Sequence, residues 1–199
     1  MQTKNKLNVK NLVGLAMMSA IVIVLQLTAR IIPPIGPFSV SLVLIPIVLG
    51  AALYGYGAGA WLGFVFALTV MISGDANAFL AINPVGTVIT VFGKGILAGL
   101  CSGVVYRLIA KKNQILAVLA ASVVCPVVNT GVFVLGCLAF FVSTIKEWAV
   151  AFNFGDNLIA YLFIGMIGAN FLFELGTNII LNPVIHTLIR VIKKNSSKK

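Results

Sequence analysis

The sequence predicts an all-α integral membrane protein of six transmembrane helices, with both termini in the cytoplasm. Hydrophobic residues make up 60% of the 199 residues and charged residues only 9%, whereas about a quarter of an average soluble sequence is charged. The mean hydropathy is +1.11. Apolar runs follow one another through most of the chain, so we expect one integral membrane domain over 1–199, with basic tails at about 1–10 and 193–199.

The first three spans are expected before residue 73. An apolar run from Asn11 to Thr28 ends at the proline-rich stretch 30–37, because proline cannot continue a helical hydrogen-bond ladder. The run from Val40 to Leu53 is shorter than the roughly 20 residues of a full span and is expected to be tilted or kinked. A tight turn at 54–57 leads to a third run, Ala58 to Ile72, whose glycines permit close helix packing.

Three further spans are expected in the second half of the chain. The run from Thr87 to Leu108 closes at the polar stretch 111–114. A fifth run from Ile115 to Val142 is expected to be broken by Pro126. The sixth and longest run extends from Asn157 to Ile192. Six crossings place the two ends of the chain on one side of the membrane.

The distribution of basic residues predicts the orientation. Cations gather near the N-terminus, around 107–112 and at 190–199, while the connections after the first, third and fifth spans hold only Arg30 and Lys146. Because cytoplasmic loops carry an excess of Lys and Arg, these clusters place both termini in the cytoplasm, as in a multi-pass protein of a bacterial plasma membrane. The loop with Lys146 and Glu147 is expected outside.

Composition also excludes several classes of function. The net charge of +10 is concentrated at helix ends and is typical of contacts with anionic lipid, not of nucleic-acid binding. Three scattered cysteines, with no Cys-x-x-Cys pair, favour packing residues over a metal site. The chain has no phosphate-binding glycine loop, so ATP chemistry has to come from partners. No constellation predicts an enzyme, a cofactor or a metal.

Only Lys94 and Glu174 are ionisable and deep in the predicted spans. Charged residues inside a membrane are costly and usually face the bundle interior or a water-filled cavity. Two hypotheses follow. The two residues form a structural ion pair, or Lys94 neutralises an anionic ligand while Glu174 takes a hydroxyl or amide. Substitution of Lys94 by Met discriminates between them through folding and binding.

Asn170, Glu174 and Asn178 are spaced four residues apart and therefore share one stripe of the last predicted span. Such a stripe cannot face lipid without unsatisfied hydrogen bonds. Either it forms interhelical hydrogen bonds, or its outer half lines a ligand cavity. Asn129 and Thr130 present the same alternatives on the fifth span.

Several residues are expected at the outer mouth of such a cavity. Asp75, Asn77 and Asn83 lie in the interruption after the third span, where a lid would be, although solvation alone explains Asp75 equally well. Phe38, in the proline-rich first loop, is a further candidate for contact with a ligand.

The combination of features resembles a known family. Six spans with cytoplasmic ends, a proline-rich first outer loop, and Ala16-x-x-x-Ala20 in the first span resemble the substrate-binding S-components of energy-coupling factor (ECF) vitamin transporters. The run 41–55, the stretch Asn83-Pro-Val-Gly and the stretch Lys94-Gly-Ile-Leu-Ala-Gly are similar to these proteins too.

This resemblance implies a high-affinity vitamin-binding subunit that works only with partners. The ligand would bind from outside in the outer half of the bundle, beneath the first and third outer loops. Ala16 and Ala20 would dock on a transmembrane T-component, which is joined to two cytoplasmic ATPases. ATP hydrolysis would then topple the S-component in the membrane and carry the ligand inward.

Within this family the polar residues resemble a pantothenate-type component. In that interpretation Lys94 meets the carboxylate, while Asn129, Asn170 and Glu174 meet the amide and hydroxyl groups. Riboflavin, another B vitamin or a queuosine-type precursor remain alternatives. A stand-alone carrier coupled to protons or sodium through Glu174 is the rival class, and it would need no ATPase partner.

Overall fold

A computed structural model describes residues 9–29 and 42–197, and within these ranges the regular structure is entirely helical. The longest helices are α1 (Val9–Ala29), α3 (Tyr56–Ser73), α5 (Pro84–Ala110) and α6 (Gln114–Phe140), each long and apolar enough to cross a membrane. α8 (Leu158–Ala160), the π-helical η1 (Tyr161–Gly168) and α9 (Ala169–Ile180) form an apolar helical segment with a bend of 41°, which makes a fifth span if it is counted as one unit. The all-α membrane fold is thereby confirmed, with four or five full-length spans among the described residues.

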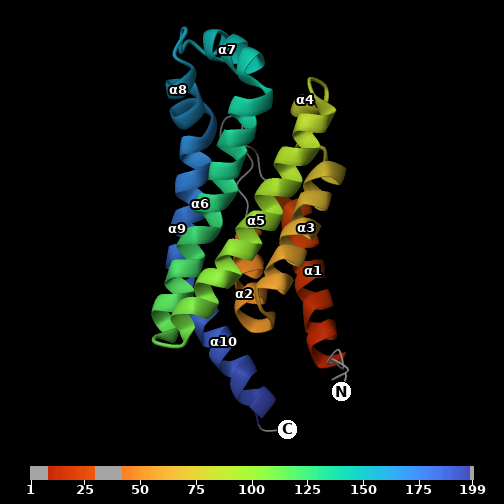
Figure 1. Ribbon diagram of the computed structural model, residues 1–199, viewed down its shortest axis with the longest axis vertical. Helices are drawn as coiled ribbons and strands as arrows, with labels where there is room; N and C mark the ends of the chain where they lie inside the picture. The colour runs from red at the N-terminus through yellow and green to blue at the C-terminus, as the bar shows by residue number, and fades with distance from the viewer. Residues whose placement is uncertain (1–8, 30–41, 198–199) are drawn as a thin grey trace, which may run out of the picture.

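The second predicted span is a half-length helix. α2 (Leu44–Tyr54) has 11 residues and therefore extends about 16 Å at 1.5 Å per residue, half the thickness of a bilayer core. The proposed beginning of this span at Val40 lies outside the described residues. α2 ends at Tyr54, and Gly55 forms the turn to α3, which begins at Tyr56. The φ of Gly55 is 99°, a value that glycine adopts without a steric penalty. In Figure 1 α2 occupies the half of the bundle nearer the two chain ends.

Two expectations about the fifth span are wrong. α6 runs without interruption through Pro126, which is buried inside the helix and does not break it. Neighbouring helices satisfy backbone groups that a proline frees in a membrane helix. The segment with Lys146 and Glu147 is also no irregular loop, because α7 (Val142–Ala151) forms there and buries Ile145 and Ala149.

The prediction of a single long sixth span is also wrong. α9 ends at Ile180, and a separate helix, α10 (Asn182–Ser197), follows after Leu181. The break lies at Leu181, just ahead of Pro183, which lacks the backbone N–H that would continue the hydrogen-bond ladder of α9. α10 buries Ile185 and Ile189 against the bundle and then leads away from it, as Figure 1 shows.

The tightest contact in the bundle joins α3 to α5. Gly63 and Gly95 face each other so closely that a Cβ on either residue would collide with the carbonyl group of the other, and Gly59 and Gly99 repeat the arrangement one turn away. Glycine pairs of this kind let two helix backbones approach where a side chain would hold them apart. The contact fixes the position of Lys94, which is the neighbour of Gly95 on α5.

The core consists of two parts that differ in location. One is built from α1, α2, α3, α5, α6 and α10 around fully buried residues such as Val22, Ile47 and Leu62. The other joins the end of α6 to α7 and η1 around Cys137, Phe141 and Ile145. A short helix, α4 (Asn77–Leu80), lies at the end of the bundle opposite the termini, where α7 also lies (Figure 1).

Candidate ligand-binding cavity

A cavity of about 490 Å³ lies between α3, α5, α6 and α9, and α4 and α7 contribute to its lining. This volume falls in the range of about 300–1,000 Å³ that is usual for small-molecule sites. None of its lining residues belongs to α2. α2 occupies the half of the bundle near the termini (Figure 1), and the cavity is lined by other elements of the chain.

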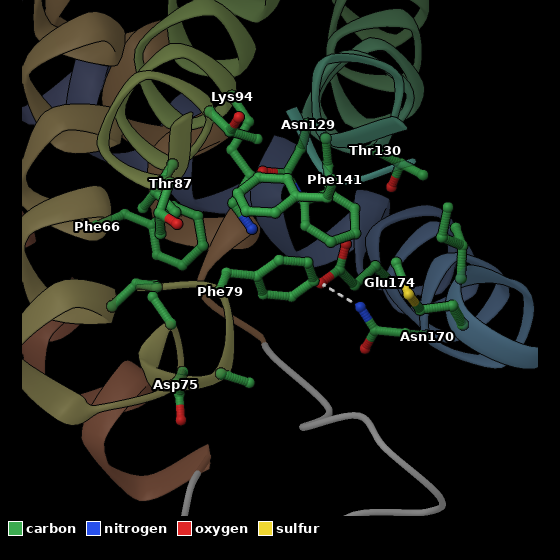
Figure 2. A pocket seen from close by; sticks show the side chains of 18 of the residues that line it. Phe66, Asp75, Phe79, Thr87, Lys94, Asn129, Thr130, Phe141, Asn170 and Glu174 are labelled. Atoms are coloured by element: carbon green, nitrogen blue, oxygen red, sulfur yellow. Dashed lines mark hydrogen bonds between the residues drawn. The ribbon is translucent and has the colours of Figure 1, made fainter. Parts of the chain in front are cut away.

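Four of the predicted site residues line this cavity together. Lys94 comes from α5, Asn129 from α6, and Asn170 and Glu174 from α9. Figure 2 shows that they approach from different sides, with Phe79 of α4 extending between them. Segments that are 80 residues apart in the chain therefore contribute to one hollow.

Lys94 is held between two aromatic rings and not by an acid. Its Nζ lies 5.1 Å from the ring centroid of Phe133 and 5.7 Å from that of Phe66. Distances within about 6 Å are those of cation–π contacts. No carboxylate oxygen of the described residues lies within 4.0 Å of this ammonium group. The structural ion pair between Lys94 and Glu174 is therefore not formed in this conformation.

Glu174 is 4% exposed, and the side chains of Asn170 and Asn129 are the polar neighbours of its carboxylate. Asn170 donates Nδ2 to Oε1 at 3.2 Å, and Oε2 is buried without a hydrogen-bond partner (Figure 2). Asn129 Oδ1 and Asn170 Oδ1 are also buried without partners. Buried polar atoms are nearly always satisfied in native structures, and these three unpartnered oxygens belong to residues that line one cavity.

Part of the predicted polar stripe lines the cavity, and part of it makes hydrogen bonds outside the cavity. Asn170 and Glu174 line the cavity. Asn178, which is 1% exposed, lies outside the lining and donates Nδ2 to the backbone carbonyl of Glu174 at 2.8 Å. Thr177 bonds to backbone carbonyls in the same way. The outer half of the stripe therefore belongs to the cavity, while the inner half is used in local hydrogen bonds of the helix.

The residues predicted at the mouth have different surroundings. Asn83 caps α5, because its Oδ1 accepts a hydrogen bond of 2.9 Å from the backbone N–H of Gly86. Asn77 begins α4 and is exposed, and neither asparagine is among the lining residues. Asp75 does line the cavity and accepts hydrogen bonds from Gln26 and Ser73. Phe38 lies outside the described residues.

The sequence interpretation missed most of the aromatic lining and three polar residues, Gln26, Thr87 and Thr90. Phe79 forms the centre of an aromatic cluster, with ring centroids 5.0 Å from Phe141, 5.5 Å from Trp148 and 5.8 Å from Phe133. Thr90 and Gln26 are buried lining residues, each with an unpartnered oxygen. Thr90 lies one turn before Lys94, and Gln26 follows a long apolar run of α1. Both signals could have been used.

The cavity contains no arrangement for metal binding. Within residues 9–29 and 42–197, no group of three or more His, Cys, Asp or Glu side chains is close enough to hold an ion. The cavity offers one cation, Lys94, two carboxylates, Asp75 and Glu174, several amide and hydroxyl oxygens, and a large aromatic surface. This set can recognise an organic molecule that carries an anionic group, hydrogen-bond donors and an apolar part.

Comparison with known families decides the class of protein. The family model of the ECF transporter substrate-specific component matches residues 10–186. The chain belongs to this family. No match was found among curated proteins or among solved structures. The protein is therefore a membrane transport component, and its family is a transporter family and not an enzyme family.

Proposed function

We propose that this ECF component binds a small, flexible vitamin of the pantothenate type in the cavity between α5, α6 and α9. The observation that carries the proposal is the separation of Lys94 from Glu174 in the cavity that both line. Lys94 has aromatic faces but no acid beside it, and Glu174 keeps an unpartnered Oε2. Two charged groups that form no direct ion pair are available to a ligand that carries both an anionic group and hydrogen-bond donors.

Each polar group has a role in this proposal. The ammonium of Lys94 forms an ion pair with the carboxylate of the vitamin. Asn129 and Asn170 offer unpartnered carbonyl oxygens to amide or hydroxyl hydrogens, and Glu174 accepts a further hydroxyl through Oε2. Asn83 acts through the start of α5, which it caps, while Asn77 and Phe38 keep their proposed place at the mouth of the cavity.

Riboflavin is a second candidate because of the aromatic lining. Phe79, Phe133, Phe141 and Trp148 form a cluster of edge-to-face contacts, and Phe152 stacks on Tyr161 with centroids 5.7 Å apart. Rings in such number favour a ligand with a flat face. The two vitamins differ in the cation site, because riboflavin has no carboxylate to place beside Lys94.

We further propose that α1 carries the docking surface for a T-component that is joined to two ATPases. Ala16 and Ala20 are exposed on one face of α1, so the chain's own described helices leave them free for a neighbouring helix. Small residues four apart permit such close helix packing. The proposal includes six membrane-embedded segments, with α2 as a half-length one, and both termini in the cytoplasm.

The ligand is tested by thermal shift of the purified protein with pantothenate, riboflavin and other B vitamins, together with mass spectrometry of any co-purified molecule. A ligand that binds the folded state raises the melting temperature by mass action. A shift with pantothenate and none with riboflavin is expected. The reverse result favours the second candidate, and no shift with any vitamin contradicts both. Uptake into vesicles without ATP and without partners would instead establish a secondary carrier.

A further inference from the structure

Gln26 on α1 is a buried polar residue at the edge of the cavity. It is 2% exposed, although the residues around it in the sequence are almost all apolar. Its side chain donates Nε2 to Oδ2 of Asp75 at 2.6 Å, and both residues line the cavity. The hydrogen bond links α1 to the turn between α3 and α4.

The partner of Gln26 determines which of its two polar atoms remains available. An ionised carboxylate only accepts hydrogen bonds, so the amide nitrogen and not the amide oxygen has to face Asp75. Ser73 Oγ donates to the same Oδ2 at 3.0 Å and strengthens this preference. The Oε1 atom of Gln26 is consequently turned away from Asp75, and it is buried with no hydrogen-bond partner.

We propose that Gln26 is a ligand-contacting residue that determines specificity, and that its Oε1 accepts a hydrogen bond from a hydroxyl or amide N–H of the ligand. The inference rests on the proposed function of the cavity as the vitamin site. Three other lining atoms also favour a hydrogen-bond donor on the ligand, because they are acceptors without partners: Asn129 Oδ1, Asn170 Oδ1 and Glu174 Oε2. A ligand that is rich in donors, with one anionic group for Lys94, satisfies all of them.

The position of Gln26 gives this contact a second consequence. It lies six residues after Ala20 on the same helix, a distance of about 9 Å along the helix axis. A ligand held by Gln26 therefore touches the helix that exposes Ala16 and Ala20. The filled cavity and the exposed face of α1 are thus connected through one continuous helix.

The test combines a protein substitution with single deletions on the ligand. Gln26→Met keeps a side chain of similar length without polar atoms. Asn178→Leu is the matched control, because Asn178 is also a buried amide with an unpartnered Oδ1 but lies outside the cavity lining. Binding is measured for pantothenate and for three analogues, each of which lacks one donor: either hydroxyl, or the amide hydrogen through N-methylation.

One analogue is expected to bind wild-type protein and Asn178→Leu about tenfold more weakly than pantothenate, while Gln26→Met does not distinguish the two. Equal losses for every analogue in all three proteins would overturn the inference, as would a loss of pantothenate affinity in Asn178→Leu that equals the loss in Gln26→Met. A purely structural role of Gln26 would lower the melting temperature and leave the ratio between ligands unchanged.

Failure of the proposed vitamin gives a different result. If wild-type protein binds riboflavin and not pantothenate, the same cycle is carried out with riboflavin analogues that lack single hydroxyls of the ribityl chain. If it binds neither, native mass spectrometry compares the fraction of protein that carries a co-purified molecule, and selective loss in Gln26→Met supports the inference. Equal retention in both variants, or a wild-type protein that carries and binds nothing, overturns it.

Discussion

Glu174 lies one helical turn beyond Asn170 on α9, and the hydrogen bond of 3.2 Å between their side chains leaves the second oxygen of the carboxylate unpartnered. The shared bond orients the carboxylate, while the remaining oxygen is available to a ligand. Glu174→Gln preserves the shape of the side chain and removes its charge. We expect about tenfold weaker vitamin binding, because a hydrogen bond to a charged acceptor is worth about 1.5–3 kcal/mol.

The exposed Glu147 on α7 is the control for this substitution. Glu147→Gln removes the same charge from an exposed position. Titration calorimetry of this variant should give the vitamin affinity of the wild-type protein. If Glu174→Gln also binds the vitamin as wild-type protein does, Glu174 has no role in recognition.

Lys94→Met tests the cation of the cavity. The variant loses the ammonium that Phe66 and Phe133 hold, and we expect vitamin affinity to fall about 30-fold or more, as when one partner of a buried charge pair is removed. The melting temperature of the ligand-free protein should stay or rise, because a charged group no longer has to be held at membrane depth. Lys146→Met on α7 serves as the exposed control. A strong decrease in stability with unchanged affinity would favour the structural alternative.

Gly95→Ala tests the contact between α3 and α5. The added methyl group would collide with the carbonyl group of Gly63, so we expect a loss of about 1–3 kcal/mol in the free energy of unfolding. Gly93→Ala, two residues earlier on α5, is the matched control, since its Cβ would meet only Val132 Cγ1 at 3.7 Å. Thermal unfolding in detergent should leave this control as stable as wild type, or more stable. Equal melting temperatures for the two variants would show that α3 and α5 separate at little cost.

Ala16→Trp and Ala20→Trp test the exposed face of α1. A large side chain there should prevent close packing of a partner helix, and co-purification of a T-component with its ATPases should fall at least tenfold, as expected when about 1.4 kcal/mol or more of association free energy is lost. Vitamin binding should be unchanged, because neither alanine lines the cavity. Leu135→Trp is the control, since Leu135 is 66% exposed on α6. Retention of the partners by both alanine variants would place the docking surface elsewhere.

The sequence predicted more of the site than of the exact helix boundaries. Lys94, Asn129, Asn170 and Glu174 were found because polar groups deep in apolar segments have to turn away from lipid. The same reasoning did not reveal Phe133, Phe141 or Trp148, since aromatic residues occur equally often in a core, at a lipid-facing surface and in a binding site. The effect of Pro126 was misjudged because neighbouring helices in a packed bundle satisfy the backbone group that a proline frees. The segment of α7 was misjudged because its charged residues, Lys146 and Glu147, were interpreted as part of a loop.

Hydropathy and charge by themselves determined that the chain is a helical membrane protein and which few polar residues had to avoid lipid. They depend on composition and local periodicity, which a linear sequence contains in full. Whether Lys94 and Glu174 would meet each other or remain apart was decided only by the tertiary structure. The half-length of α2 and the glycine contact between α3 and α5 set the distances across the bundle, and such distances arise from packing between segments far apart in the chain.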